Sequence, residues 1–323
     1  MRIKTFLAAA VCAFSFMSPA VAQVLPDRPV RLVVAYPPGG SMDPVARALA
    51  TGLSKRIGQS VIVENKPGGN TVIATQYVAN APADGSVLYF TLTTPYTMVP
   101  HMLKRKPYDP TTAMTPVAQV GEMLFAFAVT QNSPFTTLKE LVDAAKASPG
   151  KLSFPTPGIA QTIGLTSELF KTETGIDALH VPYTGSGPAV TALLSGHHDF
   201  FIADIGSVDP FVKSGKLRLL STVGNQRLRD YPNVPTLDES GYKDIVIPAA
   251  WIGIVAPPGM DDHLVMKLNE LITAEMQTPE MQRVMQSLML NVATSSPGQL
   301  ATYLKQDDEA WGALIRKLGV SID

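Results

Sequence analysis

The stretch best suited to bind a ligand is a turn rich in proline and glycine at residues 37–41. It lies between an apolar run and a helical pattern. Glycine lets the backbone approach a ligand closely, and a helix that starts directly after such a turn presents unpaired N–H groups with a partial positive charge. Asp43 suits the N-cap of this helix, although it can instead pair with Arg47 one turn further on. The turn lacks the Gly-Lys-Ser/Thr ending of a nucleotide-binding loop. It is therefore either an anion-binding turn or a tight connection without a ligand.

Two later loops, at residues 155–161 and 183–188, have the same character. Each follows a short apolar strand, contains glycine and leads into a helix. Their serine and threonine hydroxyl groups can donate hydrogen bonds to an anion, but they can equally cap their own turns. Asp204 follows another apolar strand, where it either accepts a hydrogen bond from a ligand amine or caps the next helix. The sequence predicts an anion site that is built from strand-to-helix loops and contains no cationic side chain.

Motifs for catalysis or metal binding are weak. The glycine–serine–glycine run around Ser186 lacks the G-x-S-x-G spacing of a nucleophile elbow. His197 and His198 are neighbours and therefore point apart, and no histidine has the spacing of a zinc site. We expect no metal, no cofactor and no enzymatic activity, with a secreted enzyme that uses Ser186 or Asp204 as the alternative.

The first 22 residues have the form of a secretory signal. Arg2 and Lys4 precede an apolar run that is too short for a permanent membrane span, and the small residues before Gln23 predict cleavage after Ala22. The only cysteine lies in this segment, so the exported chain would contain no disulfide. Removing two of the 26 basic residues against 27 acidic ones gives a charge of 24 − 27 = −3. This weak charge does not favour nucleic acid or an anionic membrane surface as a partner.

Strands and helices alternate along the chain, which is typical of α/β proteins, and about 300 residues are too many for one ordinary core. Two apolar strands, at residues 122–130 and 251–256, are predicted to join two lobes. We expect lobe 1 to comprise residues 23–126 plus 254–323 and lobe 2 to comprise residues 127–253. The last helices should pack onto lobe 1. Residues 93–96 are expected to form a polar loop at the cleft between the lobes.

Short motifs run in order from Tyr36 to Pro257. They are Tyr36-Pro37-Pro38-Gly39-Gly40 with Asp43 and Ala46-Arg47, Val63-Glu64-Asn65-Lys66-Pro67-Gly68, Ala83-Asp84-Gly85, Pro107-Tyr108-Asp109-Pro110, Val181-Pro182-Tyr183 with Gly185 and Pro188-Ala189, Tyr231-Pro232-Asn233-Val234-Pro235-Thr236 with Gly241-Tyr242, and Trp251 with Ala256-Pro257. This ordered set resembles the Bug family, the TctC-like extracytoplasmic receptors of tripartite tricarboxylate transporters. No single motif is specific, but together they cover most of the exported chain.

The resemblance implies a two-lobed periplasmic-binding-protein fold of type II, a Venus flytrap with a mixed sheet in each lobe and two hinge strands. It implies a small carboxylate ligand, either a di- or tricarboxylate or an aromatic acid, held by backbone amides and ordered water between residues 36–43 and 183–188. We expect a monomer that delivers this ligand to the membrane subunits of a transporter, with a ligand sensor for a signalling receptor as the alternative. The residues expected to bind the ligand are Tyr36, Pro38, Gly39, Gly40, Ser41, Asp43, Thr94, Tyr96, Thr156, Gly158, Gln161, Tyr183, Thr184, Gly185, Ser186, Gly187, Pro188 and Asp204.

Overall fold

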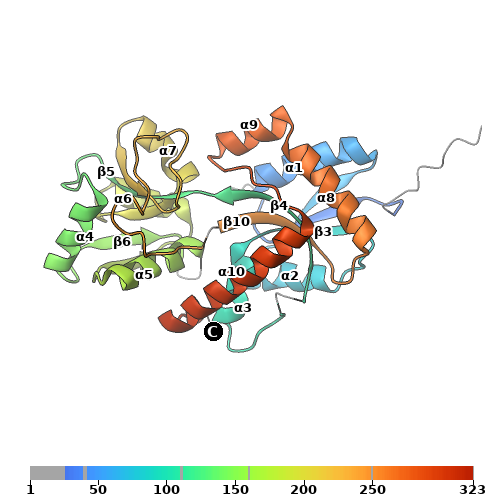
Figure 1. The fold of residues 1–323 in the computed structure, drawn as a ribbon, viewed down its shortest axis with the longest axis horizontal. Coiled ribbons are helices and arrows are strands. Elements are labelled where there is room, and N and C mark those ends of the chain that lie inside the picture. The colour runs from blue at the N-terminus through green and yellow to red at the C-terminus, as the bar shows by residue number, and fades with distance from the viewer. Residues whose placement is uncertain (1–25, 39–41, 110–111, 159–160, 249, 323) are drawn as a thin grey trace, which may run out of the picture.

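The computed structural model describes residues 26–38, 42–109, 112–158, 161–248 and 250–322, and these residues form two lobes side by side (Figure 1). The predicted signal peptide lies outside the described residues. Within the described chain, no helix combines the length and the apolar character needed to cross a membrane. The two-lobed α/β architecture predicted from the sequence is confirmed.

Lobe 1 is built on a five-stranded mixed sheet with the order β2-β1-β3-β10-β4. The first three strands are parallel to one another, and β10 runs antiparallel to both of its neighbours. The strands are β1 (Val30–Val34), β2 (Val61–Asn65), β3 (Val87–Leu92), β4 (Thr115–Met123) and β10 (Ala250–Ala256).

Helices cover both faces of this sheet, and the alternation of side chains along the strands assigns residues to each face. Leu32 and Val34 pack with α1 (Asp43–Ile57), α8 (Asp262–Met276) and α9 (Pro279–Ser287). Val33, between them, packs on the other face with α2 (Val72–Ala79) and α10 (Pro297–Leu318). Because side chains alternate across a strand, strands covered on both faces are apolar over most of their length, as β1 is apart from Arg31.

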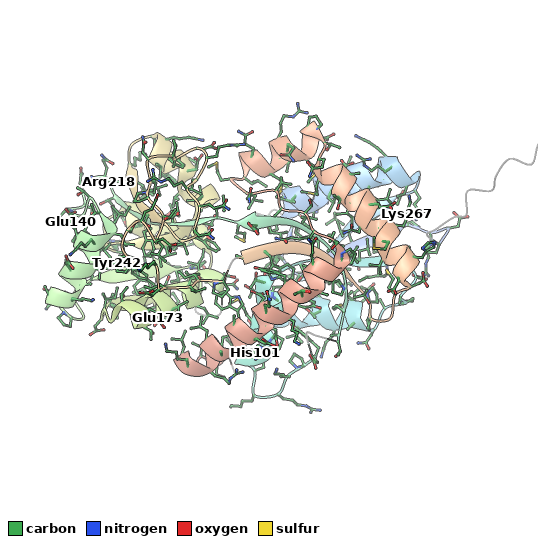
Figure 2. The ribbon with its side chains drawn as sticks, viewed as in Figure 1. His101, Glu140, Glu173, Arg218, Tyr242 and Lys267 are labelled. Carbon is green, nitrogen blue, oxygen red and sulfur yellow. The ribbon has the colours of Figure 1, made fainter. Side chains whose placement is uncertain are left out.

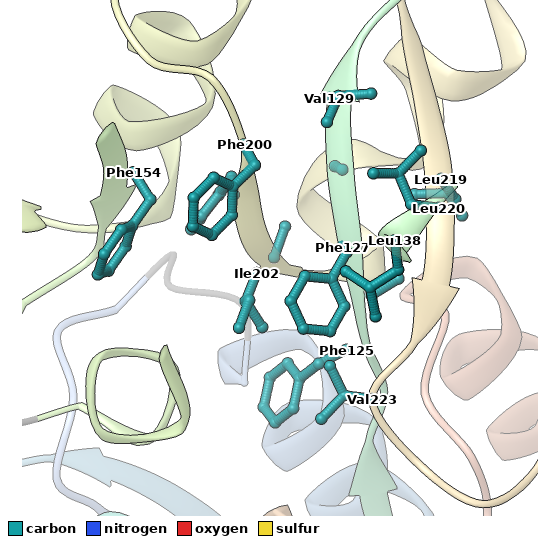
Figure 3. Close-up of a cluster of buried hydrophobic side chains, with 14 of the residues drawn as sticks. Phe125, Phe127, Val129, Leu138, Phe154, Phe200, Ile202, Leu219, Leu220 and Val223 are labelled. Atoms are coloured by element: carbon teal, nitrogen blue, oxygen red, sulfur yellow. The ribbon is translucent and has the colours of Figure 1, made fainter. Parts of the chain in front are cut away.

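Lobe 2 contains a three-stranded antiparallel sheet, β8-β5-β9, and a parallel pair, β6-β7. Aromatic side chains such as Phe127, Phe154 and Phe200 fill its core (Figure 3). The strands are β5 (Phe125–Thr130), β6 (Ser153–Thr156), β7 (Leu179–Pro182), β8 (Phe201–Asp204) and β9 (Leu217–Thr222). The helices are α4 (Leu138–Ala147), α5 (Thr162–Thr174), α6 (Ser186–Leu194) and α7 (Ile205–Lys213).

The prediction of one continuous strand over residues 122–130 is wrong, because the chain changes sheets at Leu124. Met123, at the end of β4, pairs with Ala250 in lobe 1, whereas Phe125 pairs with Asp204 in lobe 2. The carbonyl oxygen of Leu124 accepts a hydrogen bond from the N–H of Ile205. The lobe limits predicted from the sequence fall inside β5 and β10. We propose that the lobes instead divide at Leu124 and just before Ala250, where the chain passes between the two sheets.

The prediction of a polar loop at residues 93–96 is also wrong. Residues Thr94–Met98 form a π-helical turn, η2, which continues into α3 (Val99–Met102). Tyr96 is 2% exposed and packs edge-on against Trp251, with ring centroids 5.8 Å apart. Burial against lobe 1 therefore overrides the turn-forming composition of this segment.

Helix α10 contacts both lobes. The last helices pack onto lobe 1, as predicted, but Trp311, Leu314 and Ile315 of α10 also form one apolar cluster with Leu165 and Leu169 of α5. At the end of the helix, Lys317 Nζ lies 2.7 Å from Glu173 Oε1 on α5. Figure 2 shows Glu173 on the lobe 2 side and His101 on the lobe 1 side of the lower end of α10. The lobes are therefore connected by a helix-to-helix contact as well as by the strand crossings.

Candidate ligand-binding site

A cavity of about 790 Å³ lies between the two lobes. Lobe 1 contributes Tyr36, Pro37 and Met42 from the connection between β1 and α1. Lobe 2 contributes the first residues of α5, α6 and α7, and the chain just after α9 closes one side. A cavity of this size between two domains is typical of small-molecule sites.

The first turns of α1, α5 and α6 meet this cavity without a side-chain cap among the described residues. Their N-cap residues are Met42, Gln161 and Gly185, and all three line the cavity. Side chains do cap α4, α7, α8, α9 and α10. An uncapped first turn leaves N–H donors for a ligand, and the helix dipole favours a negative charge there. Glycine is required at Gly185, because its φ of 113° is a conformation that other residues rarely adopt.

Asp43 does not act as the N-cap of α1, because Met42 occupies that position. Its buried carboxylate accepts hydrogen bonds from Arg47 Nε at 2.7 Å and from Asn65 Nδ2 at 3.1 Å. Of the two alternatives derived from the sequence, the pairing with Arg47 is confirmed. Asp43 thereby connects α1 to the end of β2.

Asp204 is the only charged side chain among the described residues of the cavity wall. Its Oδ1 caps α7 by accepting a hydrogen bond from Ser207 N at 2.9 Å, and its Oδ2 accepts one from Ser186 Oγ at 2.9 Å. The capping role that the sequence left open is therefore confirmed, and a ligand contact by Asp204 stays a prediction. The Ser186 bond links the first turns of α6 and α7.

Thr94 and Thr162 join the lobes across the cavity. Their hydroxyl oxygens are 2.9 Å apart, and Thr162 Oγ1 also contacts Met98 Sδ at 3.6 Å. Both threonines are less than 10% exposed. This bond is a direct polar contact between lobe 1 and lobe 2.

The structure brings part of the predicted set to the cavity wall. Gly39, Gly40 and Ser41 lie outside the described residues. Those on the wall are Tyr36, Thr94, Gln161, Thr184, Gly185, Ser186, Gly187 and Asp204. Those that are described but do not line the cavity are Pro38, Asp43, Tyr96, Thr156, Gly158, Tyr183 and Pro188.

Several of the residues away from the wall have structural partners instead. Tyr96 lies in the lobe 1 core, as described above. Thr156 is fully buried, and its Oγ1 lies 2.6 Å from His180 Nε2, whose Nδ1 is 2.9 Å from Glu168 Oε1. The hydroxyl of Tyr183 lies 2.9 Å from His198 Nε2. Hydrogen bonds within lobe 2 therefore account for these polar groups.

The apolar part of the wall was missed by sequence reasoning. Ile163 and Ile205 follow loops that were identified, but the segment after α9 is remote from every predicted loop. Gly206 was also missed, although a Cβ atom there would lie only 2.7 Å from the carbonyl oxygen of Leu288. Glycine at this position lets α7 approach the chain after α9 across the cleft. The apolar wall residues are Met42, Leu92, Met123, Leu124, Phe125, Ile163, Ile205, Leu288, Met289 and Leu290.

The titratable groups around the site do not supply a cation. Burial raises the pKa of Tyr36, and the nearby Tyr89 and Tyr108 raise it further, so its phenol stays neutral. Among the described residues, no lysine, arginine or histidine lines the cavity and no cluster of side chains suits a metal ion. Any anion held here would be bound by neutral donors and helix N-termini.

Comparisons with known proteins agree with this architecture. Residues 45–320 match the family described as "Tripartite tricarboxylate transporter family receptor". The "UPF0065 protein in gbd 5'region" of Cupriavidus necator is 35% identical over 98% of this chain and 96% of its own length. The structure of the periplasmic binding protein BugD is similar with a TM-score of 0.77 and 30% identity, over 92% of this chain and 99% of that one. The structure of Rpa4515 from R. palustris with adipate is similar with a TM-score of 0.80 and 28% identity, over 92% and 99%. The resemblance found in the sequence is confirmed, and the chain belongs to the receptor family of tripartite tricarboxylate transporters.

Proposed function

We propose that the protein is a periplasmic solute-binding protein that captures a small carboxylate in the cavity between its lobes and delivers it to a tripartite tricarboxylate-type membrane transporter. The observation that carries this proposal is the meeting of three helix N-termini, those of α1, α5 and α6, at one cavity between the lobes, where none of them has a side-chain cap among the described residues. Together they offer backbone donors to an anion without a bound cation.

The comparisons support a carboxylate rather than another anion. The family description names a tricarboxylate transporter receptor, and the similar R. palustris protein was solved with adipate. In the mechanism that we propose, the connections β1–α1 and β7–α6 hold one carboxylate from opposite lobes. Bridging water molecules can complete these contacts at little cost in affinity.

Ligand contacts from both lobes would favour the closed arrangement over an open one, because a ligand shifts the equilibrium toward the state that it binds better. Bending at the chain crossings near Leu124 and Ala250 would open the cleft. The transporter would then recognise the closed, loaded receptor and accept the ligand when the lobes separate. A receptor without ligand would be open for most of the time and would not present the closed surface that the transporter recognises.

A binding screen tests the proposal. Protein purified from the periplasm of expressing cells is freed of retained ligand by reversible unfolding and is then tested by thermal shift and calorimetry against mono-, di-, tri- and aromatic carboxylates. We expect saturable binding of at least one carboxylate at a 1:1 ratio. Folded, ligand-free protein that binds none of them would overturn the proposal. The mass of the purified chain also reports whether cleavage follows Ala22.

Two further readouts separate the alternatives. Loss of uptake of the bound carboxylate after gene deletion supports delivery to a transporter, whereas intact uptake together with ligand-dependent capture of a sensor kinase supports signalling. Product formation by the pure protein that disappears in the Ser186→Ala variant would support an enzyme. Stoichiometric recovery of unchanged ligand would exclude this reaction.

A further inference from the structure

The polar side chains of the cavity wall are mostly committed to partners within the protein. Thr94 and Thr162 bond to each other, and Ser186 donates to Asp204. Ser207 Oγ donates to the carbonyl oxygen of Asp204, and Ser287 Oγ donates to that of Val284. A hydroxyl group whose hydrogen is already donated to another atom can only accept further hydrogen bonds. An ionised carboxylate also only accepts, so the two groups cannot bond to each other. In this arrangement Ser186, Ser207 and Ser287 donate within the protein, and the bond between Thr94 and Thr162 uses at least one of their two hydroxyl hydrogens.

Two side-chain donors on the lobe 2 part of the wall remain available. Within the described chain, the side chains of Gln161 and Thr184 line the wall, are exposed and have no hydrogen-bond partner. They lie at the beginnings of α5 and α6, beside the uncapped N–H groups of these helices. Away from these beginnings, apolar residues such as Phe125, Ile205 and Met289 make up much of the wall.

The charges of the cavity also restrict its ligand. The wall residues that the structure describes include one anion, Asp204, and no cation, and the neighbouring residues 39–41 and 159–160 are uncharged in the sequence. A second ligand carboxylate would lose its hydration without gaining a cation, and it would be repelled by Asp204. A hydroxyl or another donor on the ligand could approach Asp204 and Ser186 without this cost.

We infer that the ligand is a monocarboxylate with an apolar body, in which the single carboxylate binds at the beginnings of α5 and α6, beside Gln161 and Thr184, and the body lies against the apolar wall after α9. This inference rests on the proposed function and narrows it. It separates this chain from the similar R. palustris protein solved with the dicarboxylate adipate. A cavity of about 790 Å³ can enclose an aromatic or medium-chain acid.

Matched pairs of acids that share the same skeleton provide the test. Calorimetry at constant pH and ionic strength compares hexanoate with adipate, and benzoate with terephthalate, on ligand-free protein purified from the periplasm. In the pair whose skeleton fits the cavity, we expect the monocarboxylate to bind at least about tenfold more tightly than the dicarboxylate. A tenfold ratio of dissociation constants corresponds to about 1.4 kcal/mol of binding free energy. Equal or tighter binding of the dicarboxylate would overturn this inference and leave the proposed function intact. A lack of binding by all four acids and by every other carboxylate in the screen would overturn the proposed function itself.

A charge introduced into the apolar wall gives a second readout. Met289 is unbranched, half-buried and on the wall, so lysine and glutamine can each replace it with little change in shape. We expect Met289→Lys to shift the affinity ratio of adipate to hexanoate toward adipate by at least about tenfold, and the neutral, size-matched Met289→Gln to leave that ratio within about threefold of the parent value. An unchanged ratio in a folded Met289→Lys protein would mean that the ligand body does not lie against this wall.

Discussion

Thr94 of lobe 1 and Thr162 of lobe 2 are joined by a hydrogen bond of 2.9 Å between their hydroxyl oxygens, across the cavity between the lobes. Thr94 begins the π-helical turn η2, and Thr162 begins α5. The two residues are 68 positions apart in the sequence. Thr162 Oγ1 also contacts Met98 Sδ, which belongs to lobe 1. We expect this polar contact to break when the lobes separate.

We expect Thr94→Val and Thr162→Val each to weaken ligand binding by about threefold to tenfold, because a typical hydrogen bond contributes about 0.5–1.5 kcal/mol net. Valine keeps the branched shape, so the packing of the closed interface is preserved. Calorimetry with the tightest ligand from the screen measures the affinities, and small-angle scattering of the unliganded variants should show a larger radius of gyration than that of the parent protein.

The double variant is the control for this prediction. If the two hydroxyl groups act through each other, Thr94→Val with Thr162→Val should weaken binding no more than either single change. Thr302→Val, on an exposed position of α10, should leave affinity unchanged. Additive losses from the two cleft substitutions would contradict a direct contribution of their bond to closure.

Local signals in the sequence identified many of the elements that build the site. Pro44 marks the first turn of α1, and Gly58 ends this helix with a φ of 71°. Gly175 ends α5 in the same conformation. Such caps depend on residues within a few positions of each other, so a single sequence contains the information.

Features that depend on distant parts of the chain could not be predicted in this way. The change of sheet at Leu124 lies inside an unbroken apolar run, and periodicity does not show which sheet a strand joins. The burial of Tyr96 depends on Trp251, and the wall after α9 lies close to α7 of lobe 2, which is far away in the sequence. The sequence identified hydroxyl-bearing residues such as Ser186. It did not show which groups of the protein accept hydrogen bonds from them.

Asp204 can be tested by separating its charge from its capping role. Asparagine caps a helix about as well as aspartate, so Asp204→Asn should keep α7 intact while it removes the negative charge from the cavity. We expect monocarboxylate affinity, measured by calorimetry, to rise by about threefold to tenfold through relief of repulsion. Asp204→Ala should lose the cap as well, at a cost of about 1 kcal/mol, and lower the melting temperature by about 2 to 4 °C. Weaker binding by the Asp204→Asn protein would instead indicate that the aspartate accepts a hydrogen bond from the ligand.

Asp307 is a buried carboxyl group that connects α10 to the strands and turns of lobe 1. Its Oδ2 accepts hydrogen bonds from Trp251 Nε1 at 2.8 Å and from Thr97 Oγ1 at 2.6 Å. Burial raises the pKa of Asp307 to about 6, although these two hydrogen bonds act in the opposite direction. The group therefore keeps its proton in the folded state over a pH range where it is ionised in the unfolded chain.

This raised pKa predicts a specific dependence of stability on pH. Well below pH 4, Asp307 is neutral in both states and imposes no ionisation penalty. As the pH rises from about 4 to about 6, the unfolded chain ionises this carboxyl group while the folded state keeps it protonated, so stability falls by up to about 3 kcal/mol and levels off above pH 6. Asparagine keeps an acceptor for Trp251 and Thr97 but cannot ionise. We therefore expect the free energy of unfolding of the parent protein minus that of Asp307→Asn, from urea titrations, to decrease between pH 4 and pH 7, with most of the change between pH 4 and pH 6 and little further change above pH 6. Other titrating groups cancel in this difference, so a value that stays constant across the range would show that Asp307 is not protonated in the folded protein at mildly acidic pH.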